Sequence, residues 1–160
     1  MTTEEQLKLA VTTRQFEIQM FWQRSNYFMV LNTAIAVGFF SVVPSPLAPL
    51  LALLGFFACI SWALVTFGSK YWQSRWEEAA RRLEADCCPK AKLFAASKDE
   101  VHEEVEHSLN RGNHHGTQAW MDERILKKPS VSFQMSMLAL FFIGFWVLAF
   151  AVSLCMAGHA

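Results

Sequence analysis

The chain has 160 residues, 53% of them hydrophobic, and it carries 14 basic and 14 acidic side chains. This balance excludes a strongly basic surface for nucleic acid. The same holds within the polar segment 68–130, where basic and acidic residues are again equal in number. Three long runs without a charged residue exclude an ordinary water-soluble domain, because a chain of this length cannot shield so much apolar surface from water.

Residues 1–26 are predicted to form an amphipathic helix in the cytoplasm. Thr2 and Glu5 have the spacing of a capping box, in which each side chain accepts a bond from the other residue's backbone N–H. Apolar residues then recur at helical spacing up to Phe21, so we expect one helix that continues into the first charge-free run. That run begins too far along the chain, behind an acidic start, for a cleaved signal peptide.

Residues 27–67 are predicted to form a transmembrane helical hairpin. A segment that spans lipid must satisfy its own backbone hydrogen bonds, and it needs about 20 apolar residues. The charge-free run 47–67 reaches this length, and the run 27–43 is slightly shorter. Between them, Pro44 and Pro46 end one helix and start the next, because proline is tolerated only in the first turn of a helix.

Two features inside the hairpin are candidates for packing or for a pore. We expect Asn32 to form a hydrogen bond between helices; the alternative is that Asn32, Thr33 or Ser61 lines a pore. A seam of small residues recurs at steps of four, three and four: Ala48, Ala52, Gly55 and Cys59. Such a seam lets another helix backbone approach closely, either within the subunit or between subunits.

The segment 68–130 is predicted to be a cytoplasmic helical region. We expect the second helix to continue past the membrane and to end near Cys87-Cys88, with an apolar seam formed by Trp72, Trp76, Ala79 and Leu83. Ser97 and Glu100 have the spacing of a second capping box at the start of another helix. A short helix over 119–126 then leads to two lysines beside the third span.

A histidine-rich stretch in this region suggests a metal site, but its spacing is wrong. His102 and His107 are five residues apart, whereas a zincin helix needs histidines four apart. Glu104 and His107 supply one Glu-x-x-His pair, whereas a di-iron bundle needs two such pairs and further carboxylates; His114 and His115 could add ligands from the loop that follows. We expect a solvated acidic helix instead, whose histidines would form a pH-sensitive ring in an oligomer.

The four cysteines are interpreted as structural, because the chain has no Cys-x-x-C motif. Glycine-rich phosphate loops and nucleophile motifs are also missing from the sequence. We therefore predict no catalytic residue, no metal ligand and no cofactor, and we expect the protein not to be an enzyme.

Residues 131–158 are predicted to be the third transmembrane helix. All Lys and Arg residues lie either before Tyr27 or between Lys70 and Lys128, and none lies in the proline turn or after the third span. Cytoplasmic flanks carry the basic excess. We therefore expect an all-α integral membrane protein with three transmembrane helices and helical cytoplasmic extensions, its N-terminus in the cytoplasm and its C-terminus in the periplasm.

Three blocks combine aromatic and charged residues in a distinctive order: TRQFEI at 13–18, FWQRSNYF at 21–28 and GSKYWQSRWE at 68–77. Through these blocks the chain resembles the RipA-like family of small octameric bacterial membrane proteins, over roughly residues 5–86. The resemblance implies a homo-oligomer of eight subunits in the bacterial inner membrane, without an established catalytic activity. Because the blocks flank the cytoplasmic membrane face, we select Arg24, Asn26, Lys70 and Trp72 as candidates for a role in assembly.

The function expected from these observations is a structural or signalling role, in which cytoplasmic helices form a collar around a homo-oligomer. The alternative is an oligomeric pore for ions or small solutes, gated by pH. The partners expected are the lipid bilayer and further copies of the same chain, and nucleic acid is not expected among them.

Overall fold

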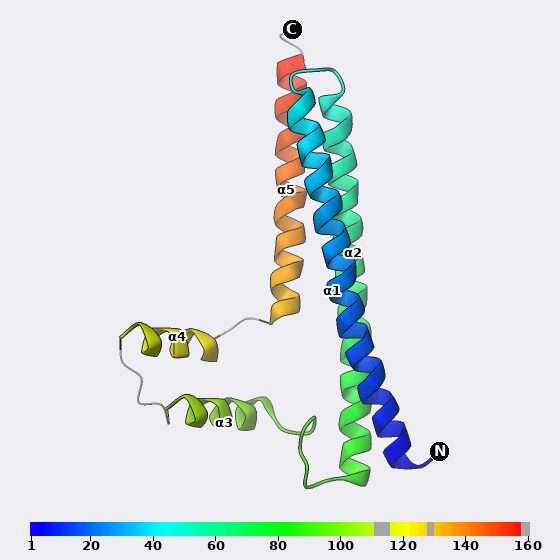
Figure 1. Ribbon diagram of the computed structural model, residues 1–160, viewed down its shortest axis with the longest axis vertical. Coiled ribbons are helices and arrows are strands. Elements are labelled where there is room, and N and C mark those ends of the chain that lie inside the picture. Colours follow the sequence, from blue (N-terminus) through cyan, green and yellow to red (C-terminus); the bar gives the residue numbers. More distant parts are fainter. Residues whose placement is uncertain (111–115, 128–129, 158–160) are drawn as a thin grey trace. The chain divides into compact units, whose positions relative to one another are not determined.

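A computed structural model describes residues 1–110, 116–127 and 130–157 of the chain. The described residues contain five helices and no strand: α1 (Thr3–Val42), α2 (Ala48–Cys87), α3 (Lys98–Asn110), α4 (Thr117–Leu126) and α5 (Val131–Ala157) (Figure 1). Three of them, α1, α2 and α5, are long and apolar enough to cross a membrane. The predicted all-α architecture with three transmembrane helices is therefore confirmed.

The chain divides into two compact units. The bundle unit comprises Gln15–Ser74 and Val131–Ala160, and the polar unit comprises Met1–Arg14 and Arg75–Ser130. Both α1 and α2 contribute residues to each unit. The division into units does not locate the membrane surfaces, so the predicted limits of the membrane hairpin at residues 27 and 67 stay predictions.

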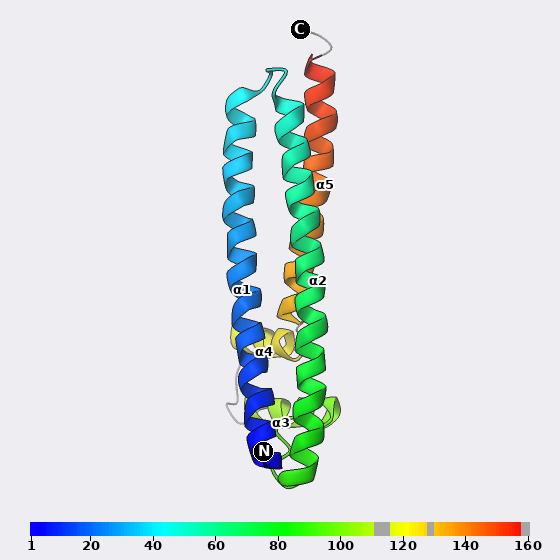
Figure 2. The same ribbon diagram turned by 90° about the vertical axis from the view of Figure 1, so that its right-hand side faces the viewer.

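In the bundle unit, α1 and α2 run antiparallel, and α5 lies alongside them in the same direction as α1 (Figures 1 and 2). Each helix buries residues at steps of three, four or seven, the spacing that keeps one face of a helix against its neighbours. The buried residues of α1 in this unit are Phe21, Ser25, Asn32, Ile35 and Phe39. Those of α2 include Ala48, Ala52, Gly55, Cys59, Trp62, Thr66, Ser69 and Gln73. Those of α5 are Ala139, Trp146, Ala149 and Ser153.

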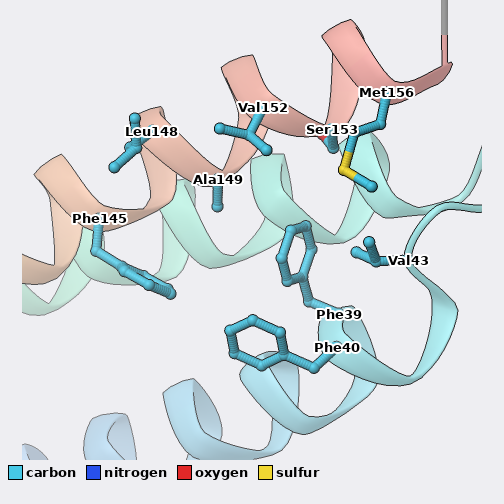
Figure 3. Close-up of a pocket in the computed structure, with 9 residues that line it drawn as sticks. All are labelled: Phe39, Phe40, Val43, Phe145, Leu148, Ala149, Val152, Ser153 and Met156. Atoms are coloured by element: carbon cyan, nitrogen blue, oxygen red, sulfur yellow. The ribbon is translucent and has the colours of Figure 1, made fainter. Parts of the chain in front are cut away.

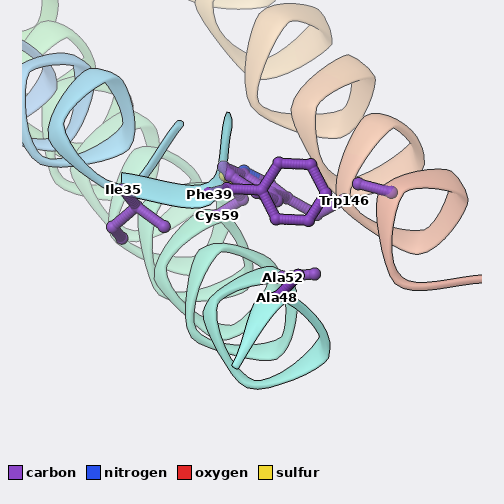
Figure 4. Packing of buried hydrophobic residues seen from close by; sticks show 7 residues of the cluster. Ile35, Phe39, Ala48, Ala52, Cys59 and Trp146 are labelled. Carbon is purple, nitrogen blue, oxygen red and sulfur yellow. The ribbon is translucent and has the colours of Figure 1, made fainter. Parts of the chain in front are cut away.

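The core of the bundle unit brings a large indole against small side chains (Figure 4). Trp146 of α5 is fully buried, and it packs with Phe39 of α1 and with the small residues of α2. A second cluster is centred on Trp62, Ala63 and Ala139. Pairing large with small residues lets the three helices pack closely around the indole.

The helix boundaries agree with several local sequence signals. Both predicted capping boxes are confirmed: Thr2 and Glu5 exchange backbone-to-side-chain hydrogen bonds at the start of α1, and Ser97 and Glu100 do the same before α3. The expectation that α1 and α2 are each uninterrupted is also confirmed, as is the predicted end of α2 at Cys87.

The predicted apolar seam in the second half of α2 is wrong in its register. Trp72 is exposed, whereas Gln73 is buried, and the fully buried alanine is Ala80 rather than Ala79. The reason is the continuity of α2: an unbroken helix keeps the register of the seam that begins at Ala48, so that polar residues and one carboxylate, Glu84, occupy buried positions.

Candidate functional site

The bundle unit contains a polar node that joins all three of its helices. The side-chain oxygen of Asn32 on α1 accepts a hydrogen bond of 2.7 Å from the indole N–H of Trp146 on α5. The same oxygen accepts a second bond, of 3.3 Å, from the thiol of Cys59 on α2. Asn32 is 5% exposed, so these bonds form in apolar surroundings, where an unpaired amide would be costly.

Gly55 makes room for this node. A Cβ atom at this position would overlap the Trp146 ring, closer than two non-bonded carbon atoms can approach. The ring is fully buried, so a side chain at position 55 would force packed atoms apart. The small-residue seam of Ala48, Ala52, Gly55 and Cys59 is buried within the subunit, where it faces α1 and α5 (Figure 4).

The four candidates for assembly differ in their surroundings. Arg24 donates a hydrogen bond of 3.1 Å from its guanidinium to the hydroxyl of Ser69, linking α1 to α2. Asn26 and Lys70 are exposed, and so is Trp72, whose ring lies edge-on to that of Tyr71. Arg24 is thus tied to a second helix, and the side chains of the other three candidates are exposed.

A row of neutral polar residues lies between α1 and α2. Ser25, Thr66, Ser69 and Gln73 are each at least 96% buried. The Thr66 hydroxyl donates to the Trp62 carbonyl oxygen, which leaves no polar group of Thr66 facing hydrocarbon. Within the described residues, Gln73 Nε2 and Trp62 Nε1 are buried without a hydrogen-bond acceptor.

An apolar pocket of about 240 Å³ lies between the end of α1 and α5 (Figure 3). Its lining consists of Phe39, Phe40, Val43, Phe145, Leu148, Ala149, Val152, Ser153 and Met156. Ser153 is the single polar side chain in this lining, and its hydroxyl donates to the Phe150 carbonyl oxygen. The pocket therefore offers dispersion contacts, and it suits a hydrocarbon chain or an apolar side chain.

The hydroxyls on the outer faces of the spans are occupied by their own helices. Thr33 and Ser61 are exposed, and each donates to the carbonyl oxygen four residues earlier, at 2.9 and 3.0 Å. A hydroxyl bonded in this way is stable in contact with hydrocarbon. The hydroxyls of these two pore candidates therefore need no hydrogen bond to water.

In the polar unit, Glu84 anchors the loop that follows α2. Its carboxylate is 2% exposed, and it accepts hydrogen bonds of 2.8, 2.8 and 2.9 Å from the backbone N–H groups of Leu93, Phe94 and Ala95. Burial raises the pKa of Glu84, but the hydrogen bonds from the three N–H groups together lower it by more, so its pKa lies below the ordinary value. The ionised carboxylate therefore fixes the loop at neutral pH.

The same loop is in contact with α1. The guanidinium of Arg14 lies 5.6 Å from the centroid of the Phe94 ring, and it also pairs with Glu77 of α2 at 2.8 Å. Arg14 thus joins α1, α2 and the anchored loop within the polar unit.

The structure does not assemble the histidine-rich stretch into a metal centre. His102, Glu104 and His107 are exposed on α3, while His114 and His115 lie outside the described residues. Among the residues that the structure describes, no group of three or more His, Cys, Asp or Glu side chains is placed to hold a metal ion. Burial and the adjacent Cys88 raise the pKa of Cys87, which disfavours the reactive thiolate.

Sequence reasoning missed two residues that organise these sites. Trp146 was not singled out, although the N–H of a buried indole usually has a hydrogen-bond acceptor. Glu84 was not singled out either; the available signal was a carboxylate in register with the buried positions of α2.

The chain matches the octameric membrane protein family (8xMP) over residues 4–155. Searches of curated proteins and of solved structures found no match.

Proposed function

Because the chain belongs to the octameric membrane protein family, we propose that it is a structural or signalling component of the bacterial inner membrane, whose eight copies form a collar with their cytoplasmic helices. In this proposal the bundle unit of each subunit lies in the lipid, and the polar unit forms the collar. The role is one of assembly or signal transmission, without catalysis.

The observation that carries the proposal is the closure of the polar node. Asn32, Cys59 and Trp146 direct their polar atoms at one another, so each subunit enters the assembly with these groups already paired. The outward side chains of α1, α2 and α5 in the spans are mainly large and apolar, as at Val37, Leu54 and Leu148. Such faces suit contact with lipid or with the neighbouring subunit.

The distribution of positive charge supports the orientation that we propose. Arg24, Lys70 and Lys127 lie close to the ends of the three charge-free runs that should face the cytoplasm, while the proline turn carries no Lys or Arg. A reporter fused after Ala160 should therefore be active only in the periplasm. Activity in the cytosol would contradict this orientation.

A pore is the second candidate, because Thr33 and Ser61 are exposed in the spans and an octamer surrounds an axis. Flux of ions and small solutes through liposomes containing the wild-type octamer, measured across pH and voltage, separates the two. Absence of flux supports the structural role. Flux that falls in Thr33→Leu or Ser61→Leu, but not in Thr12→Leu outside the spans, would overturn it.

A further inference from the structure

Helix α4 has an apolar face that the described chain leaves uncovered. None of its residues is buried, and Trp120, Met121 and Ile125 are 57%, 56% and 40% exposed. At 100° per residue these three side chains fall within roughly 140° of the helix circumference. Together with Arg124 they form a continuous surface, which we name the α4 face.

The basic and the acidic side chains of α4 lie on different sides of the helix. The guanidinium of Arg124 lies 5.3 Å from the Trp120 ring centroid, so the one basic residue inside the face stacks on its largest aromatic. Asp122 and Glu123 lie on other sides of the helix, and the Glu123 carboxylate pairs with Lys127 at 2.6 Å. The face is thus aromatic, aliphatic and basic, without a carboxylate.

We propose that the α4 face lies in the headgroup layer of the membrane, with phospholipid as its partner. A helix that lies in the interface typically buries Trp and aliphatic residues to the level of the first acyl carbons, while Arg and Lys reach the phosphates. The α4 face has this composition, and its two acidic residues turn away from it.

The length of the chain supports the same partner. Only residues 127–130 separate the last residue of α4, Leu126, from Val131, the first residue of a candidate membrane span. Five residue steps cover at most about 18 Å even when fully extended. The end of α4 is therefore tethered close to the surface through which the third span enters the lipid.

Spin labels on the full-length octamer in liposomes test this proposal. Cys87, Cys88 and Cys155 are replaced by Ser, while Cys59 is kept because it is buried. Labels are then placed with Met121→Cys and Ile125→Cys on the α4 face, and with Glu123→Cys away from it as the matched control. Oxygen, which concentrates in lipid, and a water-soluble nickel chelate report the surroundings of each label.

The oxygen-to-nickel accessibility ratio should be several-fold higher at positions 121 and 125 than at 123, in liposomes of phosphatidylethanolamine and phosphatidylglycerol. Equal ratios at all three positions would place the α4 face in water and overturn the proposal. Low accessibility to both reagents at 121 and 125 would show a protein partner, such as a second copy of the chain, and would overturn it as well. Elution as an intact octamer establishes that each labelled variant is folded.

Discussion

The two compact units of this protein differ in the polar groups that they bury. In the bundle unit, every buried polar side chain among the described residues is neutral: Ser25, Asn32, Thr66, Ser69, Gln73 and Ser153. In the polar unit, the buried polar side chain is the carboxylate of Glu84. One unit thus buries neutral amides and hydroxyls, and the other holds a full charge with three backbone N–H groups.

This difference follows from what surrounds each unit. A buried charge needs several donors, and a loop at a helix end offers free N–H groups, whereas the backbone of a membrane-spanning helix is already paired with itself. A neutral amide needs fewer partners, which neighbouring spans can provide. The same chain therefore uses helix-to-helix side-chain bonds in one unit and side-chain-to-loop bonds in the other.

The largest effect is expected from filling the space beside Trp146. Gly55→Leu should prevent α5 from packing against α2, and Gly55→Ala should destabilise the bundle by about 1–3 kcal/mol because its Cβ would overlap a buried ring. The temperature at which the octamer dissociates in detergent measures the effect of both variants. Gly68→Ala is the control: no atom lies within 4 Å of its Cβ position, so this variant should be as stable as wild type or slightly more stable.

The second-largest loss of stability is expected from removing the charge of Glu84, which anchors the loop after α2. In Glu84→Gln one of the two acceptor oxygens becomes a donor, and the loss of charge-assisted bonds should cost about 1.5–3 kcal/mol. Faster hydrogen exchange at Leu93, Phe94 and Ala95 would report the released loop. Unchanged protection of these amides would show that Glu84 does not hold the loop.

The pH dependence of the anchor has a defined sign. The folded-state pKa of Glu84 is below its ordinary value of 4.5, so its contribution to stability is fully present above that value. The contribution is lost as the pH falls through the lowered pKa. Protection of the 93–95 amides in wild type should therefore decrease in acid, whereas in Glu84→Gln this step should be missing.

Removing the acceptor of the polar node should have a moderate effect. Asn32→Leu leaves the Trp146 N–H buried without an acceptor, and bonds between membrane helices contribute about 0.6–2 kcal/mol. Adding Trp146→Phe removes that unpaired donor, so the double variant should lose less than the sum of the two single variants. Strict additivity would mean that the two side chains do not interact.

The smallest effect is expected at the ion pair of the polar unit. Arg14 and Glu77 are partly exposed, so Arg14→Ala should cost less than about 1 kcal/mol, in part through the lost stacking on Phe94. Thermal unfolding at low and high salt would measure the ionic part, which salt should reduce. Arg14→Lys is a useful comparison, because it keeps the charge and loses the planar guanidinium.

Much of the fold was predictable because its signals are local. Charge-free runs mark the spans, Pro44 and Pro46 mark the turn, and the capping boxes mark two helix starts. The register of the second half of α2 was mispredicted because Trp72 is apolar and was assigned to the inside; burial instead follows the seam that begins within the bundle. Tryptophan beside a basic residue is equally suited to an exposed position at a membrane surface.

The candidate sites were only partly predictable because their partners are distant in sequence. Asn32 could be selected as a polar residue in an apolar run, but its bond to Trp146 joins residues 114 positions apart. The anchor of the 93–95 loop depends on backbone N–H groups, which every sequence possesses and which no residue pattern marks.

The pairing of Asn32 with Trp146 also bears on the order of biosynthesis. The ribosome completes α1 and α2 long before α5, so a nascent hairpin enters the bilayer while its amide oxygen still lacks the indole N–H. Until the last helix arrives, this oxygen can accept from the Cys59 thiol of the hairpin but not from Trp146, so the docking of α5 completes the pairing of a polar group inside an apolar run.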